Sequence, residues 1–166
     1  MPDYELIDSA RFADDESELV SAVVKGLYVC WRENRGEDGL ISASSIELES
    51  YPKLLPEATI LDVVNEGEDL RVRFLGNKLA SRYPDGTGKL LRDVVSPGLW
   101  LDRTLKICRA VVVTRRVLVN GPTSATFPGF EHLALEGLYV PMTLTGAHVD
   151  RILIVNALWT DRAEYS

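Results

Sequence analysis

Hydrophobic and polar residues alternate in the middle of the chain, on either side of a turn at residues 65–69. Residues 58–64 are rich in Thr, Ile, Leu and Val, and after the turn Leu70, Val72 and Phe74 alternate with two arginines. A period of two is typical of a strand with one buried face, and Asn and Gly between two such runs favour a turn. The pattern predicts a hairpin with Leu70, Val72 and Phe74 on one face.

A helical pattern precedes this hairpin and predicts a helix over residues 19–35. Asp15 and Glu18 have the spacing of a capping box, and Arg35-Gly36 is typical of a helix end. The face of this helix either packs on the core of its own domain or pairs with the same helix of a second chain. Its width and its terminal tryptophan favour a homodimer. The expected contacts are Val20, Val24, Leu27 and Trp31.

After the hairpin, short helical pieces lead to one longer helix, and the chain then turns to strand patterns. Short helical segments are expected at 46–55, 78–82 and 88–95, a longer helix at 99–114, and strands at 117–120, 132–144 and 149–159. This order predicts an α+β domain with a five-stranded antiparallel sheet and helices on one face. The expected organisation is a leader arm at 1–18, a single domain at 19–159 and a C-terminal tail at 160–166.

Composition narrows the function classes. The 166 residues are 46% hydrophobic and 26% charged, with a net charge of −7. Such an acidic chain is not expected to bind nucleic acid or an anionic membrane, which require clustered Lys and Arg. No secretory signal and no apolar run of about 20 residues is visible, which predicts a soluble cytoplasmic protein. Cys30 and Cys108 lie in apolar helical patterns and are expected to be buried, reduced thiols.

The order of elements resembles the PAS domain, and local motifs resemble those of bacterial stand-alone PAS proteins whose core follows a helix with Trp and Arg-Gly. The resemblance covers about residues 19–159. The motifs that carry it are Trp31 with Arg35-Gly36, Leu54-Leu55-Pro56, Leu61-Asp62-Val63, Val72-Arg73-Phe74-Leu75-Gly76, Thr87-Gly88, Glu136, Pro141-Met142 and the run from Val149 to Leu153.

This resemblance implies a sensory or regulatory module with a pocket between sheet and helices, frequent dimerisation, and signalling to a protein partner. The residues expected to bind a small ligand are Val72, Arg73, Phe74, Leu79, Leu90, Leu105, Cys108, Tyr139 and Met142. Arg73 could hold a ligand carboxylate, pair with an acid such as Glu136, or form an exposed cross-strand ion pair. The apolar members of the list describe an ordinary filled core equally well.

Enzyme and cofactor signals are weak. His132 and His148 fall at a strand start and in a turn, where haem ligation is not expected, and Cys108 lacks the setting of a flavin-reactive cysteine. We find no phosphate loop, metal-spaced cluster or nucleophile motif. The sequence predicts a non-enzymatic regulatory domain without cofactor or metal. Two alternatives stay open: a small enzyme or carrier with the cone-shaped fold of nuclear transport factors, acting on an apolar molecule, and a purely structural dimerisation module.

Overall fold

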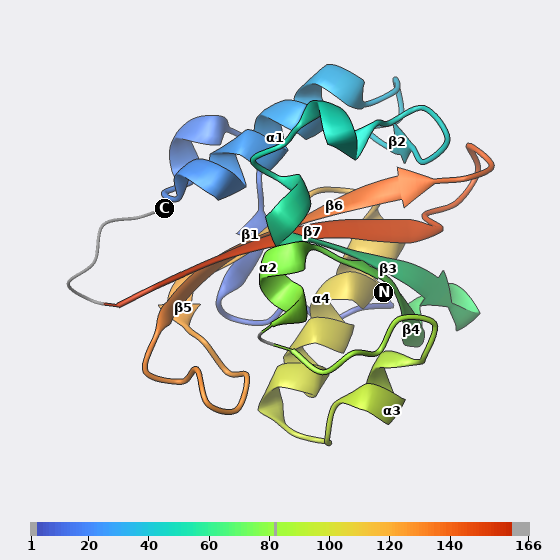
Figure 1. Cartoon of the computed structure of the whole chain (residues 1–166). Coiled ribbons are helices and arrows are strands. Elements are labelled where there is room, and N and C mark those ends of the chain that lie inside the picture. The colour runs from blue at the N-terminus through green and yellow to red at the C-terminus, as the bar shows by residue number, and fades with distance from the viewer. Residues whose placement is uncertain (1–2, 82, 161–166) are drawn as a thin grey trace.

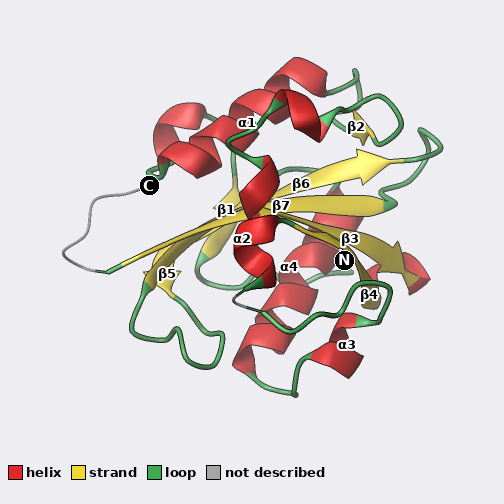
Figure 2. Cartoon of the chain, viewed as in Figure 1, coloured by secondary structure: helices red, strands yellow, loops and turns green. Residues whose placement is uncertain are grey.

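The computed structural model describes residues 3–81 and 83–160 and shows an α+β fold with a mostly antiparallel sheet (Figures 1 and 2). The sheet order is β1 (Ala10–Phe12), β5 (Leu118–Ser124), β6 (Ala134–Thr143), β7 (Arg151–Trp159), β3 (Ala58–Val64) and β4 (Asp69–Leu75), and β2 (Ile41–Ser42) pairs in parallel with β6. The helices are α1 (Ala22–Asn34), α2 (Asn77–Ala80), α3 (Leu91–Val94) and α4 (Leu99–Thr114), with 3₁₀ turns at Glu16–Glu18, Leu48–Ser50, Leu55–Glu57 and Asn65–Gly67.

The hairpin of β3 and β4 lies where its alternating pattern predicts it, but one side chain lies on the other face. Ile60 pairs with Phe74 and Leu61 with Val72, so the register shifts between them and Arg73 is the extra residue of a bulge. Val72 packs in the cluster that contains α4, whereas Phe74 packs against the cluster that contains α1. The prediction that both side chains share one face is therefore wrong.

Helices cover both faces of the sheet, which corrects the prediction of a five-stranded sheet with helices on one face. In β6, Leu138 and Val140 pack in the cluster of α1, and Tyr139 between them packs in the cluster of α4. Successive residues of a strand point to opposite faces, so α1 and α4 lie on opposite sides. Figure 1 shows this sandwich, with α1 above the sheet and α3 and α4 below it.

Part of the expected leader arm, residues 1–18, belongs to the sheet. Ala10 pairs with Asn120 and Phe12 with Leu118, which makes β1 the edge strand beside β5. Ile7, Ala10 and Ala13 are buried. Three residues are too short for hydrophobic periodicity to predict a strand, and pairing with β5 supplies the missing hydrogen bonds. The expected tail at 160–166 lies outside the described residues, apart from Thr160.

The apolar face of α1 packs on the sheet of its own chain. Val24 and Leu27 are fully buried, and Trp31 is buried with its indole Nε1 donating to the carbonyl of Gly39 at 2.7 Å. Val20, the fourth expected dimer contact, is partly exposed just before the helix. Three of these four side chains thus serve the core of a single chain. A homodimer itself stays a prediction.

None of the helices within residues 3–81 and 83–160 has the length and apolar character that crossing a bilayer requires.

Candidate functional site

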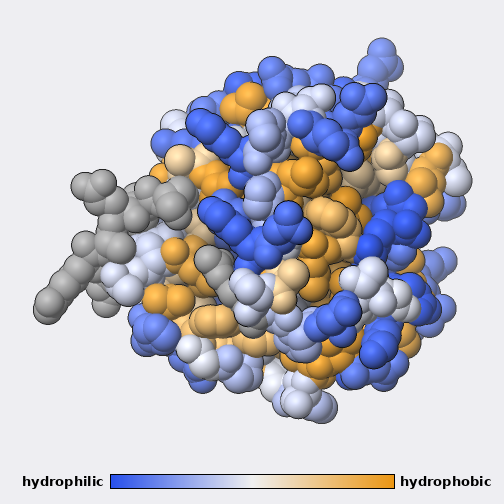
Figure 3. All heavy atoms as spheres, in the orientation of Figure 1, coloured by the Kyte–Doolittle hydropathy of each residue, from blue (hydrophilic) through white to orange (hydrophobic). Residues whose placement is uncertain are grey.

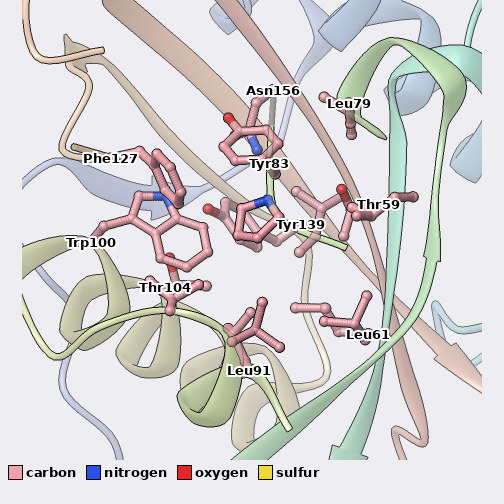
Figure 4. Close-up of a pocket in the computed structure, with 16 residues that line it drawn as sticks. Thr59, Leu61, Leu79, Tyr83, Leu91, Trp100, Thr104, Phe127, Tyr139 and Asn156 are labelled. Carbon is pink, nitrogen blue, oxygen red and sulfur yellow. The ribbon is translucent and has the colours of Figure 1, made fainter. Parts of the chain in front are cut away.

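A partly open cavity of about 70 Å³ lies between the sheet and the helices that follow the hairpin (Figure 4). Strands β3, β4, β6 and β7 form one wall, and α2, α3 and the start of α4 form the other. A second cavity of about 30 Å³ adjoins it and reaches toward β5. The two share part of their lining: Tyr83, Trp100, Thr104, Phe127, Tyr139 and Asn156.

The walls of the larger cavity are apolar with a few uncharged polar groups. Leu61, Val72, Leu79, Leu91 and Ile154 provide aliphatic surface from both sides. The polar side-chain groups of the lining are the hydroxyls of Thr59, Tyr83, Thr104 and Tyr139, the indole N–H of Trp100 and the amide of Asn156. Among the residues that the structure describes, no charged side chain lines this cavity. An apolar pocket with a few placed polar groups is the usual form of a small-molecule site.

The amide of Asn156 is the most unusual of these groups. Its Oδ1 atom is buried and has no hydrogen-bond partner among the described residues. Asn156 pairs across the sheet with Gly137, and a Cβ atom built on Gly137 would lie 2.1 Å from this oxygen. A residue other than glycine at position 137 would push the Asn156 amide out of this position. The strand pair therefore holds an unpaired acceptor, covered in the ligand-free protein, on a residue that lines both cavities.

Four half-buried aromatic side chains pack where the two cavities meet. The ring of Phe127, in the segment between β5 and β6, makes T-shaped contacts with Tyr83 at 4.7 Å and Trp100 at 5.1 Å between ring centroids. Phe130 lies 5.8 Å from both Tyr83 and Phe127. Edge-to-face packing of this kind stabilises each pair by about 0.5–1.5 kcal/mol beyond area burial. Figure 4 shows Phe127 and Trp100 together at one side of the cavity.

Burial keeps the groups around the cavity neutral. It raises the pKa of the Tyr139 hydroxyl, with a smaller contribution of the same sign from Cys108. Burial also raises the pKa of the Cys108 thiol far above its ordinary value. Both groups stay protonated at neutral pH, since the charged form would be poorly solvated there. Among the residues that the structure describes, the lining of this cavity contains no Asp, Glu, His, Cys or Lys.

The structure brings together only some of the predicted ligand contacts. Val72, Leu79 and Tyr139 line the larger cavity, and Cys108 packs in the core on the same face of the sheet. Five others do not line either cavity: Arg73, Phe74, Leu90, Leu105 and Met142. Met142 packs with α1 on the opposite face. The role of the cavity residues in binding stays a prediction.

Arg73 lies on the open surface of the hairpin. Its Nε donates to both carboxylate oxygens of Asp62, at 2.8 and 2.9 Å, and Arg151 reaches the same carboxylate at 3.0 Å. Hydrogen bonding to Asp62 raises the pKa of Arg73, which stays a cation. Its partner is thus Asp62 across the strand, and Glu136 accepts hydrogen bonds from Val20 and Ser21 on the α1 side.

Several lining residues were not among the predicted contacts. Tyr83, Trp100, Phe127 and Asn156 lie in segments that meet only in the folded chain. The sequence did offer a sign of Phe127, because Phe127 and Phe130 are aromatic residues on either side of Pro128-Gly129, in a segment where polar residues are usual. Asn156 also interrupts the apolar run of the last strand, where a polar side chain is expected to form a hydrogen bond.

In residues 3–81 and 83–160, no group of three His, Cys, Asp or Glu side chains is placed to hold a metal ion. His132 and His148 are exposed. Figure 3 shows a mainly hydrophilic face with hydrophobic residues between. A shallow groove runs between α1 and residues 50–57, lined in part by Val23, Val29 and Leu54.

Comparison with protein-family models, with curated proteins and with solved structures found no match to this chain. The functional argument therefore depends on the site itself.

Proposed function

We propose that this protein is a PAS-like sensory or regulatory domain that binds a small, uncharged molecule in the cavity between β3, β4, β6, β7 and helices α2 to α4. The observation that carries the proposal is the lining of that cavity, which among the described residues is aliphatic and aromatic with a few uncharged polar groups and no charged side chain. A charged ligand would lose its hydration there without a counter-ion. We propose binding of this molecule without a catalytic step.

The order of elements supports the PAS-like part of this proposal. Two strands, two short helices, a longer helix and three strands follow each other as β3, β4, α2, α3, α4, β5, β6 and β7. This is the succession on which the sequence resemblance was based. The sheet order places the first hairpin beside the last strand, so the connecting helices close over one face. That closure creates the cavity.

The signal would pass to a second chain or to a protein partner. Because Val24, Leu27 and Trp31 pack inside, a homodimer through α1 would use the outer side of the helix. Val29 is partly exposed in the groove beside residues 50–57, and Val23 lines the same groove while it packs against the core. We propose this groove as the dimer contact in place of the buried stripe.

The enzyme or carrier alternative has less support. A cone-shaped enzyme of the nuclear-transport-factor type is expected to gather acids or histidines in its pocket. The lining of the two adjoining cavities, in the described part of the chain, includes no Asp, Glu or His. Arg103 is the charged residue of the smaller cavity, and its guanidinium lies 3.4 Å from Asp8.

Native mass spectrometry of the purified protein, beside a denatured sample, tests the proposal. We expect a mass excess of a small molecule in the native spectrum that disappears on denaturation. A stripped sample should regain the excess from a cell extract. A protein that carries no molecule and takes up none, from extract or from a panel of small apolar compounds, would contradict the proposal.

A further inference from the structure

The side-chain oxygen of Asn156 is buried without a hydrogen-bond partner among the described residues. Buried polar groups nearly always have a hydrogen-bond partner, and an unmet acceptor lowers stability by about 1–3 kcal/mol. The Oδ1 atom of Asn156 has no partner among the described residues, and Asn156 lines both cavities. A ligand that donates a hydrogen bond would satisfy this atom once a covering side chain moves, because the oxygen itself is closed off in the ligand-free protein. The acceptor thus points to a donor on the ligand.

Gly137 makes this acceptor a built feature of the sheet. Its backbone has no positive φ, so the local conformation does not require glycine. The present position of the amide does, because a Cβ at residue 137 would lie 2.1 Å from Asn156 Oδ1 and would push it aside. Strand interiors are weakened by glycine, and such a residue often marks a close approach. The pair of Gly137 and Asn156 therefore preserves the acceptor at a cost to the strand.

Phe127 suggests the shape of the ligand. Its ring lines both cavities and makes edge-to-face contacts with Tyr83 and Trp100. The cavities of about 70 and 30 Å³ are together smaller than the roughly 150 Å³ that encloses benzene. Removal of the Phe127 ring would join them. A ligand ring in its place could make the same contacts with Tyr83 and Trp100.

We propose that the cavity binds a neutral, single-ring aromatic molecule with a hydrogen-bond donor, of the phenol class. The ring displaces the side chain of Phe127 and packs against Tyr83 and Trp100, and the donor binds Asn156 Oδ1. This inference rests on the proposed function, since it names the ligand class of the same cavity. In the ligand-free protein, the Phe127 side chain fills the space that the ligand ring takes when it binds.

Phenol and toluene form the matched pair of probes, because a hydroxyl replaces a methyl group on the same ring. Binding is measured by titration calorimetry on the wild-type protein, on Phe127→Ala and on Phe127→Ala with Asn156→Leu. We expect Phe127→Ala to bind phenol at least tenfold more tightly than the wild-type protein does. It should prefer phenol over toluene about tenfold, and Asn156→Leu should abolish that preference.

Melting curves accompany each titration, and Phe127→Leu replaces Phe127→Ala if the latter does not fold. Gly137→Ala is a second test, since it displaces the Asn156 amide and should also remove the preference for phenol. Equal binding of phenol and toluene to the opened variant would overturn the inference and leave the proposed function intact. If neither probe binds the wild-type protein or an opened, folded variant, the inference fails. The proposed function then depends on the mass-spectrometric result alone.

Discussion

The backbone N–H of Ser21 donates to the buried carboxylate of Glu136, 115 residues away in the sequence, at 2.8 Å. The N–H of Val20 donates to the same carboxylate at 2.9 Å. Ser21 precedes the first residue of α1 and its side chain forms no cap. Glu136 thus supplies from β6 what a capping-box glutamate supplies within its own helix. Its carboxylate also lies at the N-terminus of α1, where a negative charge interacts favourably with the helix dipole.

Replacement of Glu136 by alanine should lower the free energy of unfolding by about 3 kcal/mol, because two backbone donors lose their partner inside the core. Glu136→Gln keeps one acceptor oxygen and should lower it by about half as much. Urea denaturation measures both. Glu49→Gln, at an exposed position, is the control and should change stability by less than about 0.5 kcal/mol. Equal stability of Glu136→Ala and the control would show that the carboxylate does not hold α1.

Hydrophobic periodicity predicts the long elements of this fold well. The helix at 99–114 matches α4, and the hairpin at 58–64 and 70–75 matches β3 and β4 to within a residue. Periodicity could not predict the bulge at Arg73. The extra residue leaves the alternation of residue types in the sequence unchanged, but it turns the side chain of Phe74 to the other face of the sheet. It could not predict β1 either, since three residues show no period.

The candidate site was predictable only in part, because its unusual features depend on pairs that are distant in sequence. Val72, Leu79 and Tyr139 are apolar or aromatic residues that any core on this face would use. The significance of Asn156 depends on the absence of a side chain at Gly137, its neighbour across the sheet. Strand register had to be known before that relation could be seen.

Gly137→Ala should push the Asn156 amide aside, because its Cβ would overlap Asn156 Oδ1 at the end of a rotatable side chain, and should lower the free energy of unfolding by no more than about 1 kcal/mol. The same change in an Asn156→Ala background should have a much smaller effect, since the overlapping atom is gone. A double-mutant cycle in urea isolates the coupling between the two sites. Additive effects of the two substitutions would mean that Gly137 serves another purpose.

Asn156→Leu should stabilise the ligand-free protein, although it removes a side chain that we assign to the site. Loss of an unpaired buried acceptor and gain of apolar volume both favour the folded state, by about 1 kcal/mol in total. Functional sites often sacrifice stability in this way. Thermal melting of the ligand-free protein measures the change. A lower melting temperature would indicate that the amide has a structural partner.

Arg73→Ala should leave ligand binding unchanged and lower stability by less than about 1 kcal/mol, because the ion pair with Asp62 is exposed. Asp62→Ala should lower it more, since the carboxylate also pairs with the less exposed Arg151. Phenol titration and urea denaturation of both variants test the two effects. Loss of binding in Arg73→Ala would return Arg73 to the site, as the sequence first suggested.

If the protein forms a homodimer through the outer side of α1, Val29→Lys should weaken it at least tenfold without unfolding the chain. Val29 lines the groove beside residues 50–57 and is partly exposed. Trp31→Ala is a poorer probe, because Trp31 is buried and its loss should destabilise the fold by about 3–5 kcal/mol. Sedimentation equilibrium measures the dissociation constant. An unchanged dimer of Val29→Lys would place the contact elsewhere.

The buried thiols should make stability fall at alkaline pH. Burial raises the pKa of Cys30 from its ordinary value of 9.0 to about 11, although hydrogen bonds from Tyr51 and Asn34 oppose the shift. Between pH 9 and 11 the unfolded chain has lost a proton that the folded chain keeps. The contribution of Cys30 to stability is therefore complete below pH 9 and is lost as pH rises toward 11, by up to about 1.4 kcal/mol per pH unit.

Denaturation curves at several pH values from 8 to 10.5 should show this fall, and Cys30→Ala should reduce its slope. Part of the slope should remain, because burial raises the pKa of Cys108 and Tyr139 in the same direction. At pH 8 a thiol reagent should label neither cysteine in the folded protein and both in urea, since only the thiolate reacts readily. Rapid labelling of the folded protein, or an unchanged slope in Cys30→Ala, would mean that Cys30 is open to solvent.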